Sequence, residues 1–457
     1  MSTENQKGQI LIITTVFMAI VTTLVVALVG YATVEIRSHR QAVGRVQGLS
    51  IAEAGIEAAV WKLNNEPGYT GETDTVFENG TYNIILEDLA GGTKLVRAEA
   101  FIPDSTNPRA KRVIQITVAT GTTNIGFNYG VQVGQGGLEM TNSSRVIGNI
   151  YSGGDIEGNN SARISGTAIV SGATGTIDNI HIDEDVIAHF VNNSVVDGSV
   201  ETFALTNGTT GGNVVATYIY KTSACTIGGN ATYDANSGCI VGGIETTPNP
   251  DDFVDPEDVD LPIGDDQIND WEAEALAGGV IGSQVITGTA SLGPIKINGD
   301  LSVSVSGRLT VTGTIWVTGN VTFSNSAIVE LASGFGSSSG IILAGIEGSE
   351  DQGLIDVKNS AQIRGSGTEG SYLMLVSQKT NETAIKLSNS AIVSILYAPF
   401  GEVEINNSAN LKEVVAYELD IKNSAVVSYE SGLASLNFSS GPSGGWEVLD
   451  QTWQLIQ

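Results

Sequence analysis

The densest group of potential metal ligands in the sequence is a run of carboxylates between residues 246 and 279. Its acidic members are Asp251, Asp252, Asp255, Glu257, Asp258 and Asp260. Carboxylate oxygens are the ligands that Ca²⁺ prefers in proteins. The spacing fits neither an EF-hand loop nor a Gly-Gly-x-Gly-x-Asp repeat. Calcium held by Asp251, Asp252, Asp255 and Asp258 is therefore one expectation, and a solvated acidic linker without a cofactor is the other.

A second group of ligand types combines His181 and His189 with three acidic residues, Asp183, Glu184 and Asp185. The two histidines are eight positions apart, which matches no template of a transition-metal site, so polar loop residues are the alternative interpretation. The sequence contains no P-loop, dinucleotide fingerprint, Ser-His-Asp constellation or metalloprotease helix. We therefore expect a protein that is not an enzyme. Cleavage of a polysaccharide would require paired carboxylates on one exposed face.

The chain contains two cysteines, Cys225 and Cys239, in the Gly- and Asn-rich stretch ACTIGGNATYDANSGC. Their spacing differs from the CxxC of redox and zinc sites, so we predict one disulfide. Closing this short loop would add about 3 kcal/mol of stability and would indicate an oxidising compartment. Two buried free thiols are the alternative.

The net charge of -29 is distributed unevenly along the chain. Five of the 21 Lys/Arg and four of the 50 Asp/Glu lie in residues 1–64, which leaves 16 basic and 46 acidic residues, or -30, beyond them. A body with this charge repels nucleic acid and attracts divalent cations or basic partners. Charged residues are only 16% of the chain, so hydroxyls and amides must supply much of the surface polarity.

The N-terminal region predicts one long helix over residues 9–64. Its first part, residues 10–34, contains no Asp, Glu, Lys or Arg, and the first charged residue after it is Glu35. This part is longer than the roughly 20 residues that a helix needs to cross a bilayer. The pattern then becomes amphipathic and meets its first proline at Pro67. A cleaved secretory signal would have a shorter apolar run and an Ala-x-Ala site.

This helix, preceded by the polar leader MSTENQKG of residues 1–8, resembles that of type IV prepilins, and its AEAG segment at residues 52–55 resembles PilX-type minor pilins. The resemblance implies that a prepilin peptidase cuts after Lys7 and Gly8, so that the mature chain begins at Gln9. It also implies a single-pass membrane precursor that joins other pilin-like subunits through the helix and reaches the cell surface. Major pilins have Glu at the fifth mature position, where this chain has Ile13, and this difference favours a minor or tip subunit.

The charges that flank the apolar segment predict the opposite membrane orientation to the one that the prepilin resemblance implies. Arg37, Arg40 and Arg45 follow it, whereas Lys7 precedes it, and the positive-inside rule would therefore place the large body in the cytoplasm. The prepilin resemblance requires that body to lie outside. The predicted disulfide and the polar surface agree with the outside location.

Residues 65–124 predict a small antiparallel meander with a turn at Asn79 and Gly80, packed on the rear of the helix. The small residues at this end of the helix allow close approach: Ala52, Ala54, Gly55, Ala58 and Ala59. Four short strands are marginal without such a partner.

The tripeptide Asn-Ser-Ala recurs along the remainder of the chain with apolar residues on both sides. Its asparagines include Asn325, Asn359, Asn389, Asn407 and Asn423, separated by 34, 30, 18 and 16 residues, or one or two steps of about 17. A fixed step with strand-like composition indicates a β-solenoid. Counting by twos places Asn and Ala on one face of a strand and Ser on the other. We expect the asparagines to stack as a ladder of amide hydrogen bonds.

The predicted fold is therefore mainly β, with a pilin-like N-terminal helix and sheet followed by a parallel β-helix of about 16 rungs. Its two parts are residues 125–245, in which residues 142–172 begin the array, and residues 280–445. Residues 246–279 interrupt it as an acidic, proline-rich crossing with a short helix that covers an edge or an end, and residues 446–457 cap the last coil. The coil pattern is similar to bactofilin cores, and a β-sandwich is the alternative. We expect a surface adhesin that contacts a glycan or a protein, or alternatively a membrane-anchored β-helix that binds or cleaves polysaccharide.

Overall fold

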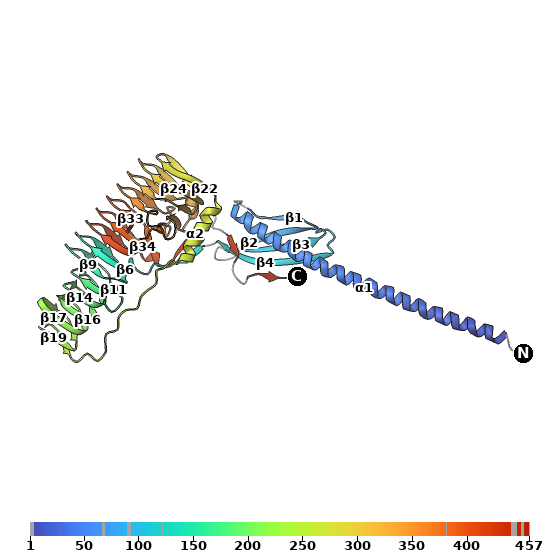
Figure 1. The fold of residues 1–457 in the computed structure, drawn as a ribbon, viewed down its shortest axis with the longest axis horizontal. Coiled ribbons are helices and arrows are strands. Elements are labelled where there is room, and N and C mark those ends of the chain that lie inside the picture. The colour runs from blue at the N-terminus through green and yellow to red at the C-terminus, as the bar shows by residue number, and fades with distance from the viewer. Residues whose placement is uncertain are drawn as a thin grey trace. The chain divides into compact units, whose positions relative to one another are not determined.

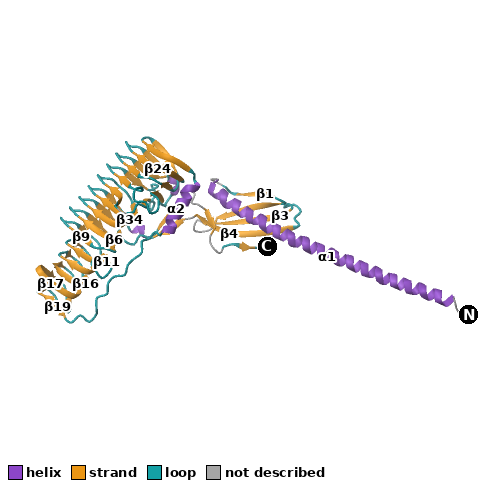
Figure 2. Cartoon of the chain, in the orientation of Figure 1, coloured by secondary structure: helices purple, strands orange, loops and turns teal. Residues whose placement is uncertain are grey.

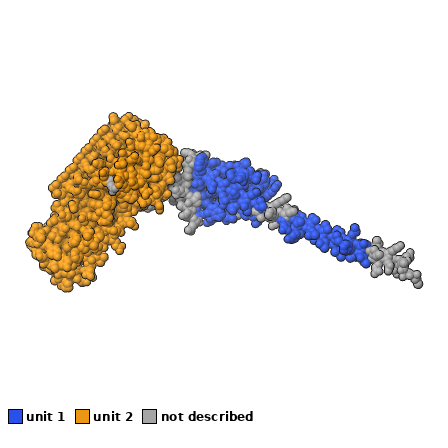
Figure 3. All heavy atoms as spheres, viewed as in Figure 1, with its two compact units in different colours: residues 1–120, 446–457 blue, residues 121–445 orange. Residues whose placement is uncertain are grey.

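The computed structural model describes residues 4–65, 69–88, 93–120, 122–380, 382–439, 446–448 and 452–456. It divides into two compact units, residues 1–120 with 446–457 and residues 121–445 (Figure 3). Strands make up 48% and helices 15% of the chain, which confirms the predicted mainly β class (Figure 2).

The first unit begins with helix α1 (Glu4–Asn65). Three threonine hydroxyls in its apolar part donate hydrogen bonds to carbonyl oxygens one turn earlier, from Thr22 at 2.7 Å, from Thr23 at 2.5 Å and from Thr33 at 2.7 Å. These bonds satisfy the hydroxyls within the helix itself. The threonines are therefore compatible with an apolar surrounding, where an unsatisfied hydroxyl would be costly.

Four antiparallel strands pack on the rear of α1: β1 (Gly71–Phe77), β2 (Gly80–Asp88), β3 (Thr93–Ile102) and β4 (Ala110–Thr120). Phe77 pairs with Gly80, so the first turn consists of Glu78 and Asn79, one residue earlier than predicted. The meander and its packing partner follow the sequence expectation.

Small residues on one side of α1 bring the sheet close to the helix. Ala52, Gly55 and Ala59 are buried, whereas Ala54 and Ala58 are half-buried. A Cβ added to Gly55 would lie 3.1 Å from the ring of Tyr82. The helix thereby completes a core that the four strands could not form by themselves.

The described part of the C-terminal segment pairs with the first unit, whereas residues 446–457 were expected to cap the solenoid. Strands β39 (Trp446–Val448) and β40 (Gln454–Leu455) instead pair antiparallel with β4 of the first unit. Between these strands, the hydroxyl of Thr452 accepts a hydrogen bond of 3.1 Å from the backbone N–H of Thr117. The outer edge of β4 offers free backbone donors and acceptors, and the C-terminal segment satisfies them.

The second unit is a parallel β-solenoid of about 16 turns (Figure 1). One segment contains β6 (Val131–Met140), β7 (Arg145–Ile147), β8 (Ile150–Ser152), β9 (Ile156–Gly158), β10 (Arg163–Ile164), β11 (Ala168–Val170), β12 (Thr176–Asp178), β13 (His181–Ile182), β14 (Val186–Asn192), β15 (Val195–Val196), β16 (Val200–Thr210), β17 (Val214–Ile227), β18 (Ala231–Thr232), β19 (Ala235–Ser237), β20 (Ile240–Val241) and β21 (Glu245–Thr246). We call residues 131–246 the early segment.

The late segment, residues 280–428, has the same plan of short parallel strands. It contains β22 (Val280–Ile286), β23 (Thr289–Leu292), β24 (Ile295–Val303), β25 (Arg308–Val311), β26 (Ile315–Val317), β27 (Val321–Phe323), β28 (Ile328–Leu331), β29 (Gly340–Ala344), β30 (Ile355–Val357), β31 (Gln362–Arg364), β32 (Leu373–Ser377), β33 (Thr383–Leu387), β34 (Ile395–Ile405), β35 (Asn410–Leu411), β36 (Glu413–Ile421) and β37 (Val426–Ser428). A short antiparallel pair, β5 (Thr122–Ile125) with β38 (Leu436–Ser439), joins the beginning and the end of the unit.

The order of the coils in space differs from their order in the chain. Strand β36 of the late segment pairs parallel with β6 of the early segment, and β37 pairs with β7. The stack therefore runs from residue 280 to 428 and continues from residue 131 to 246, and Figure 1 shows β6 between β34 and β11. The expectation that residues 142–172 begin the array is wrong, since they lie in the middle of the stack.

Residues 247–264, which we call the strap, connect the two ends of the stack and lead into α2 (Asp265–Ala277). The strap contacts several coils in turn, as its hydrogen bonds from Tyr151 and Gln132 show: Tyr151 donates to the carbonyl of Glu257 at 3.2 Å and Gln132 to that of Asp260 at 2.9 Å. Figure 2 shows the strap as a long loop beside the solenoid. The segment therefore covers a side face, and not the edge or end that we expected.

Helix α2 packs on the outside of the coils through an apolar side. Ile268, Trp271 and Ala275 are buried in a cluster that also contains Tyr397 and Phe438. The hydroxyl of Tyr397 donates a hydrogen bond of 2.5 Å to the carbonyl of Ile263 at the end of the strap. The helix ends at Gly278, as predicted.

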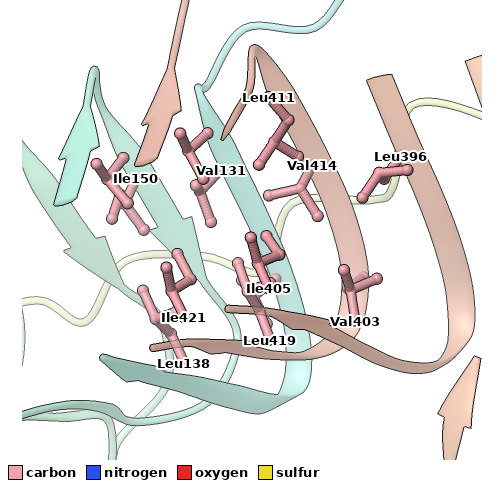
Figure 4. Packing of buried hydrophobic residues seen from close by; sticks show 14 of the residues in the cluster. Val131, Leu138, Ile150, Leu396, Val403, Ile405, Leu411, Val414, Leu419 and Ile421 are labelled. Carbon is pink, nitrogen blue, oxygen red and sulfur yellow. The ribbon is translucent and has the colours of Figure 1, made fainter. Parts of the chain in front are cut away.

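The core of the solenoid is a stack of aliphatic side chains that continues through the junction of the two segments. Val403 on β34 lies in register with Leu419 on β36, which lies in register with Leu138 on β6. Figure 4 shows these residues in a row across the view, from Leu138 at the left to Val403 at the right. All three are buried, so the junction has the same interior as the other coils.

Candidate functional sites: the apolar helix, the ladder and the polar faces

The front of α1 is long, apolar and exposed. Residues Ile13–Thr33 form one helix that is long and apolar enough to cross a membrane, with a mean hydropathy of 2.4 and none of its surface buried against the rest of the protein. Ile13, Phe17 and Met18 are all exposed. By length and composition, such a helix could serve as a membrane anchor or as a signal segment.

The predicted processing site lies within the backbone of α1, which includes Lys7, Gly8 and Gln9. The side chains of these three residues lie outside the part of the chain that the structure describes, as do those of Arg37 and Arg40. The predictions about cleavage and about membrane orientation therefore stay predictions.

The five predicted asparagines form a continuous row of side-chain hydrogen bonds. Each amide nitrogen donates to the amide oxygen of the preceding member, at 3.0 Å from Asn359 to Asn325, 3.0 Å from Asn389 to Asn359, 3.0 Å from Asn407 to Asn389 and 3.2 Å from Asn423 to Asn407. We call this row the asparagine ladder. Each inner member both donates and accepts, so the row links successive coils without a break.

The tripeptide itself is a turn, which corrects the expectation that Asn and Ala alternate with Ser along a strand. Asn407 and Ser408 have φ values of 53° and 61°, and the other repeats are alike. Asn and Ser are exposed and only the alanine is buried. Asparagine tolerates this left-handed backbone better than other non-glycine residues, which gives a second reason for its recurrence besides its amide.

The ladder extends beyond the five predicted members and crosses the junction of the segments. Asn142 donates to Asn423 at 2.9 Å, and Asn160 donates to Asn142 at 3.0 Å. Asn160 begins an Asn-Ser-Ala tripeptide, whereas Asn142 begins Asn-Ser-Ser, which the strict pattern missed. Further along the early segment, Asn207 donates to Asn193 at 3.1 Å.

Cys225 and Cys239 are joined in a disulfide. Both are buried, Cys225 in β17 and Cys239 in the coil that follows it. The bond therefore links the last two full coils of the early segment inside the core.

The acidic residues of the strap do not gather at one point. Asp251 and Asp252 are exposed, whereas Asp255 Oδ1 lies 2.7 Å from His189 Nδ1 and Asp258 Oδ1 accepts a hydrogen bond of 2.6 Å from Ser171. Two of the four predicted calcium ligands thus hold the strap against separate coils. The acidic side chains are therefore spread along the solenoid, and calcium binding by these residues stays a prediction.

In the described residues, a different group brings three ligand atoms within 4.8 Å: His181, Asp183 and Asp197. Arg163 already pairs with both carboxylates, at 2.5 Å to Asp183 and 3.7 Å to Asp197. The hydrogen bond from Arg163 to Asp183 raises the pKa of the guanidinium. His189 lies apart from this group, so the histidine cluster of the sequence is divided between a charge network and the strap contact.

A row of carboxylates follows the register of three neighbouring strands. Asp420, Glu139 and Glu157 are paired positions on β36, β6 and β9, and they line a groove of about 280 Å³ with Asp155 and Glu418. Burial raises the pKa of Asp420, an effect that Lys422 opposes and that Glu139 reinforces. The groove is strongly negative and disfavours anionic ligands.

A larger cavity of about 770 Å³ lies on the late segment beside β28 and β31. Its lining is mostly polar and includes Glu330, Ser333, Arg364, Thr368 and Glu369. Hydroxyls, carboxylates and one guanidinium in a shallow cavity are groups that can hydrogen-bond a polyhydroxylated ligand.

Comparison with known proteins adds little to this description. No protein-family model matches the chain, and no curated protein matches it. Among solved structures, the competence-associated pilin ComZ from Thermus thermophilus is similar at 10% identity, over 91% of this chain and 97% of that chain, with a TM-score of 0.23. A TM-score this low carries no argument about the fold or the function of this chain.

Proposed function

We propose that this chain is a minor or tip pilin-like subunit of a type IV pilus or a related envelope machine. The observation that carries the proposal is helix α1, a single helix of 62 residues with an exposed apolar front and a rear that packs on a four-stranded antiparallel sheet. The front requires a membrane before assembly and a bundle of similar helices afterwards. A helix that only anchored the chain would not need to continue unbroken into the core of a folded unit.

In this proposal the prepilin peptidase removes residues 1–8 and the mature chain begins at Gln9. Ile13 presents an alkyl group where a major pilin has a carboxylate. An uncompensated carboxylate in hydrocarbon is costly, so its absence removes both a pairing device and a penalty. This difference supports a subunit that is present in few copies, with its solenoid outside the cell.

The experiment is N-terminal sequencing and intact-mass measurement of the native protein, with Gly8→Ala as the test variant. We expect the wild-type chain to lack its first eight residues and Gly8→Ala to retain them. Gly30→Ala is the matched control, since Gly30 lies in the same helix and an added Cβ there meets nothing within 4 Å. Retention of the leader in the native protein would contradict the proposal and would favour a surface protein that is anchored but never assembled.

Adhesion is the second part of the proposal, and the cavity lined by Arg364 and Glu330 supports it. A mostly polar cavity fits a glycan better than an apolar ligand. We expect Arg364→Ala to reduce glycan binding on an array of oligosaccharides, with Arg145→Ala, on an exposed residue of β7 outside the cavity, as the control. Release of shorter oligosaccharides, lost in Glu330→Gln, would instead favour the alternative of a polysaccharide-cleaving β-helix.

A further inference from the structure

One end of the solenoid stack has an unpaired strand edge. In the described part of the chain, β22 pairs only with β24 and β23 pairs only with β25, whereas β24 also pairs with the next coil through β26 and β27. A Cβ added to Gly282 or Gly288 in this coil would meet nothing within 4 Å, but one added to Gly293 would lie 2.3 Å from the carbonyl oxygen of Gly313 in the coil beyond. Among the described residues, no strand therefore pairs with the outer edge of the β22–β23 coil.

This end also lacks the features that normally prevent strand edges from associating. Residues 278–295 contain no Asp, Glu, Lys, Arg or His, although the chain has a net charge of -29. Val280 is 56% exposed and Val285 is 76% exposed. Natural proteins usually protect an open edge with charged residues, a proline within the strand or a covering element. The β22–β23 coil has none of these in its strands.

The opposite end of the stack is built differently. Its last coils contain Asp234 and Glu245, and the disulfide between Cys225 and Cys239 ties them together. Acidic residues at an edge oppose association with another acidic body. The two ends therefore differ in charge and in covalent reinforcement.

The junction inside the solenoid shows that its coil edges can join without a continuous chain. The coil of β36 and β37 stacks on the coil of β6 and β7, although almost three hundred residues of sequence separate their positions. Backbone pairing, core packing of Leu419 on Leu138 and the bond between Asn423 and Asn142 hold this contact. The junction thus shows that two coil edges of this protein, remote in sequence, associate through parallel backbone pairing and a shared core.

We propose that the uncovered edge of β22 binds the same edge of a second copy of this chain, forming a twofold dimer through its end coils. The sides of two bodies with this negative charge repel each other, and a same-end contact brings together only uncharged residues. A contact between opposite ends would instead desolvate Asp234 and Glu245. A twofold contact uses the same patch on both copies and closes on itself, so it gives a dimer and not a fibre.

Cross-linking of the full-length protein in detergent tests this proposal directly. Because Cys225 and Cys239 are both in a disulfide, Val285→Cys adds a unique thiol. We expect mild oxidation to produce a disulfide-linked dimer of Val285→Cys. Val254→Cys, at an equally exposed valine of the strap, is the control for chance encounters within a micelle and should remain monomeric.

A second variant measures the strength of the contact. Val285→Lys places like charges on facing edges and should raise the dissociation constant of the dimer by about 10-fold or more in sedimentation experiments. Val254→Lys should leave it unchanged. Since Val285 is exposed, the lysine should not disturb folding.

Two results would overturn the proposal. The first is cross-linking of Val285→Cys that does not exceed that of Val254→Cys, which would show that the edge does not dimerise. The second is a disulfide between Val285→Cys and Ile240→Cys in a mixture, without a Val285→Cys homodimer, which would show that opposite ends associate.

Discussion

The early and late segments of the solenoid share one coil plan but stabilise it by different means. The late segment repeats Asn-Ser-Ala five times in register, and these repeats supply the five members of the asparagine ladder from Asn325 to Asn423. The early segment keeps only Asn160 in that tripeptide and ends in a disulfide. The comparison shows that a stacked fold needs regular backbone turns and a filled core, whereas the linking device between coils is interchangeable.

The largest effect is expected at the junction of the late and early segments, where β36 pairs with β6. Leu419→Ala removes a fully buried side chain between β34 and β6, and we expect a loss of about 4 kcal/mol in the free energy of unfolding. If the two segments form one cooperative stack, amide hydrogen exchange should accelerate in both β36 and β6.

Leu309→Ala in β25 is the matched control, since Leu309 is equally buried but far from the junction. Its effect on exchange should be largest in the late segment. Acceleration confined to the late segment in Leu419→Ala as well would mean that the halves are stable separately.

Removal of the disulfide should affect only the early end. The bond closes a loop with a sequence separation of 14, for which the chain-entropy model gives about 3 kcal/mol. In Cys225→Ser with Cys239→Ser, we expect faster hydrogen exchange in residues 231–246 and unchanged exchange in the late segment. Equal acceleration at both ends would show that the stack transmits the loss along its length.

Glu413 at the start of β36 predicts a pH dependence of the junction. It is fully buried, neither carboxylate oxygen has a hydrogen-bond partner in the described structure, and burial raises its pKa well above 4.5. The folded state therefore binds the Glu413 proton more tightly than the unfolded state does. Below the unfolded-state pKa, the contribution of Glu413 to the free energy of unfolding is fully present. That contribution is lost as pH rises from there toward the folded pKa.

Glu413→Gln keeps the shape of the side chain without the charge. We expect its free energy of unfolding to exceed that of the wild type at pH 7 and to fall less between pH 4.5 and pH 7, as measured by denaturant titration. A wild-type curve parallel to that of the variant would refute the assignment. Asp420→Asn provides a comparison, because Lys422 offsets part of the burial effect on the pKa of Asp420.

The smallest expected effects concern single rungs of the ladder. Asn407→Ala removes bonds to Asn389 and Asn423 and places alanine in a left-handed conformation, so a loss of about 2 kcal/mol in unfolding free energy is expected. Asn407→Gly relieves the backbone cost and should lose about 1 kcal/mol. Equal losses in thermal or chemical unfolding would mean that the amide contributes everything and the backbone preference nothing.

Much of the architecture could be predicted from the sequence because it depends on local pattern. The uncharged run, the small residues around Gly55 and the step of about 17 between asparagines predicted the helix, its packing side and the stacked coils. The same pattern led to two errors. Counting by twos assumed an extended backbone at Asn407 and Ser408. A tripeptide gives no direct sign of φ, and only the left-handed values in the structure separate a turn from a strand. The separations of 34 and 30 residues, interpreted as two steps of about 17, are each a single coil, because their asparagines bond directly.

The amino-acid order alone determined the mainly β class, the presence of stacked coils and where the helix is apolar, because each of these follows from side-chain chemistry at short range. Only the tertiary structure decided that residue 131 stacks on residue 414, that the strap crosses a side face and that the C-terminal strands pair with β4. Coils of the same pitch with aliphatic interiors are nearly interchangeable as neighbours. Their order is therefore decided by how the whole chain closes its open edges.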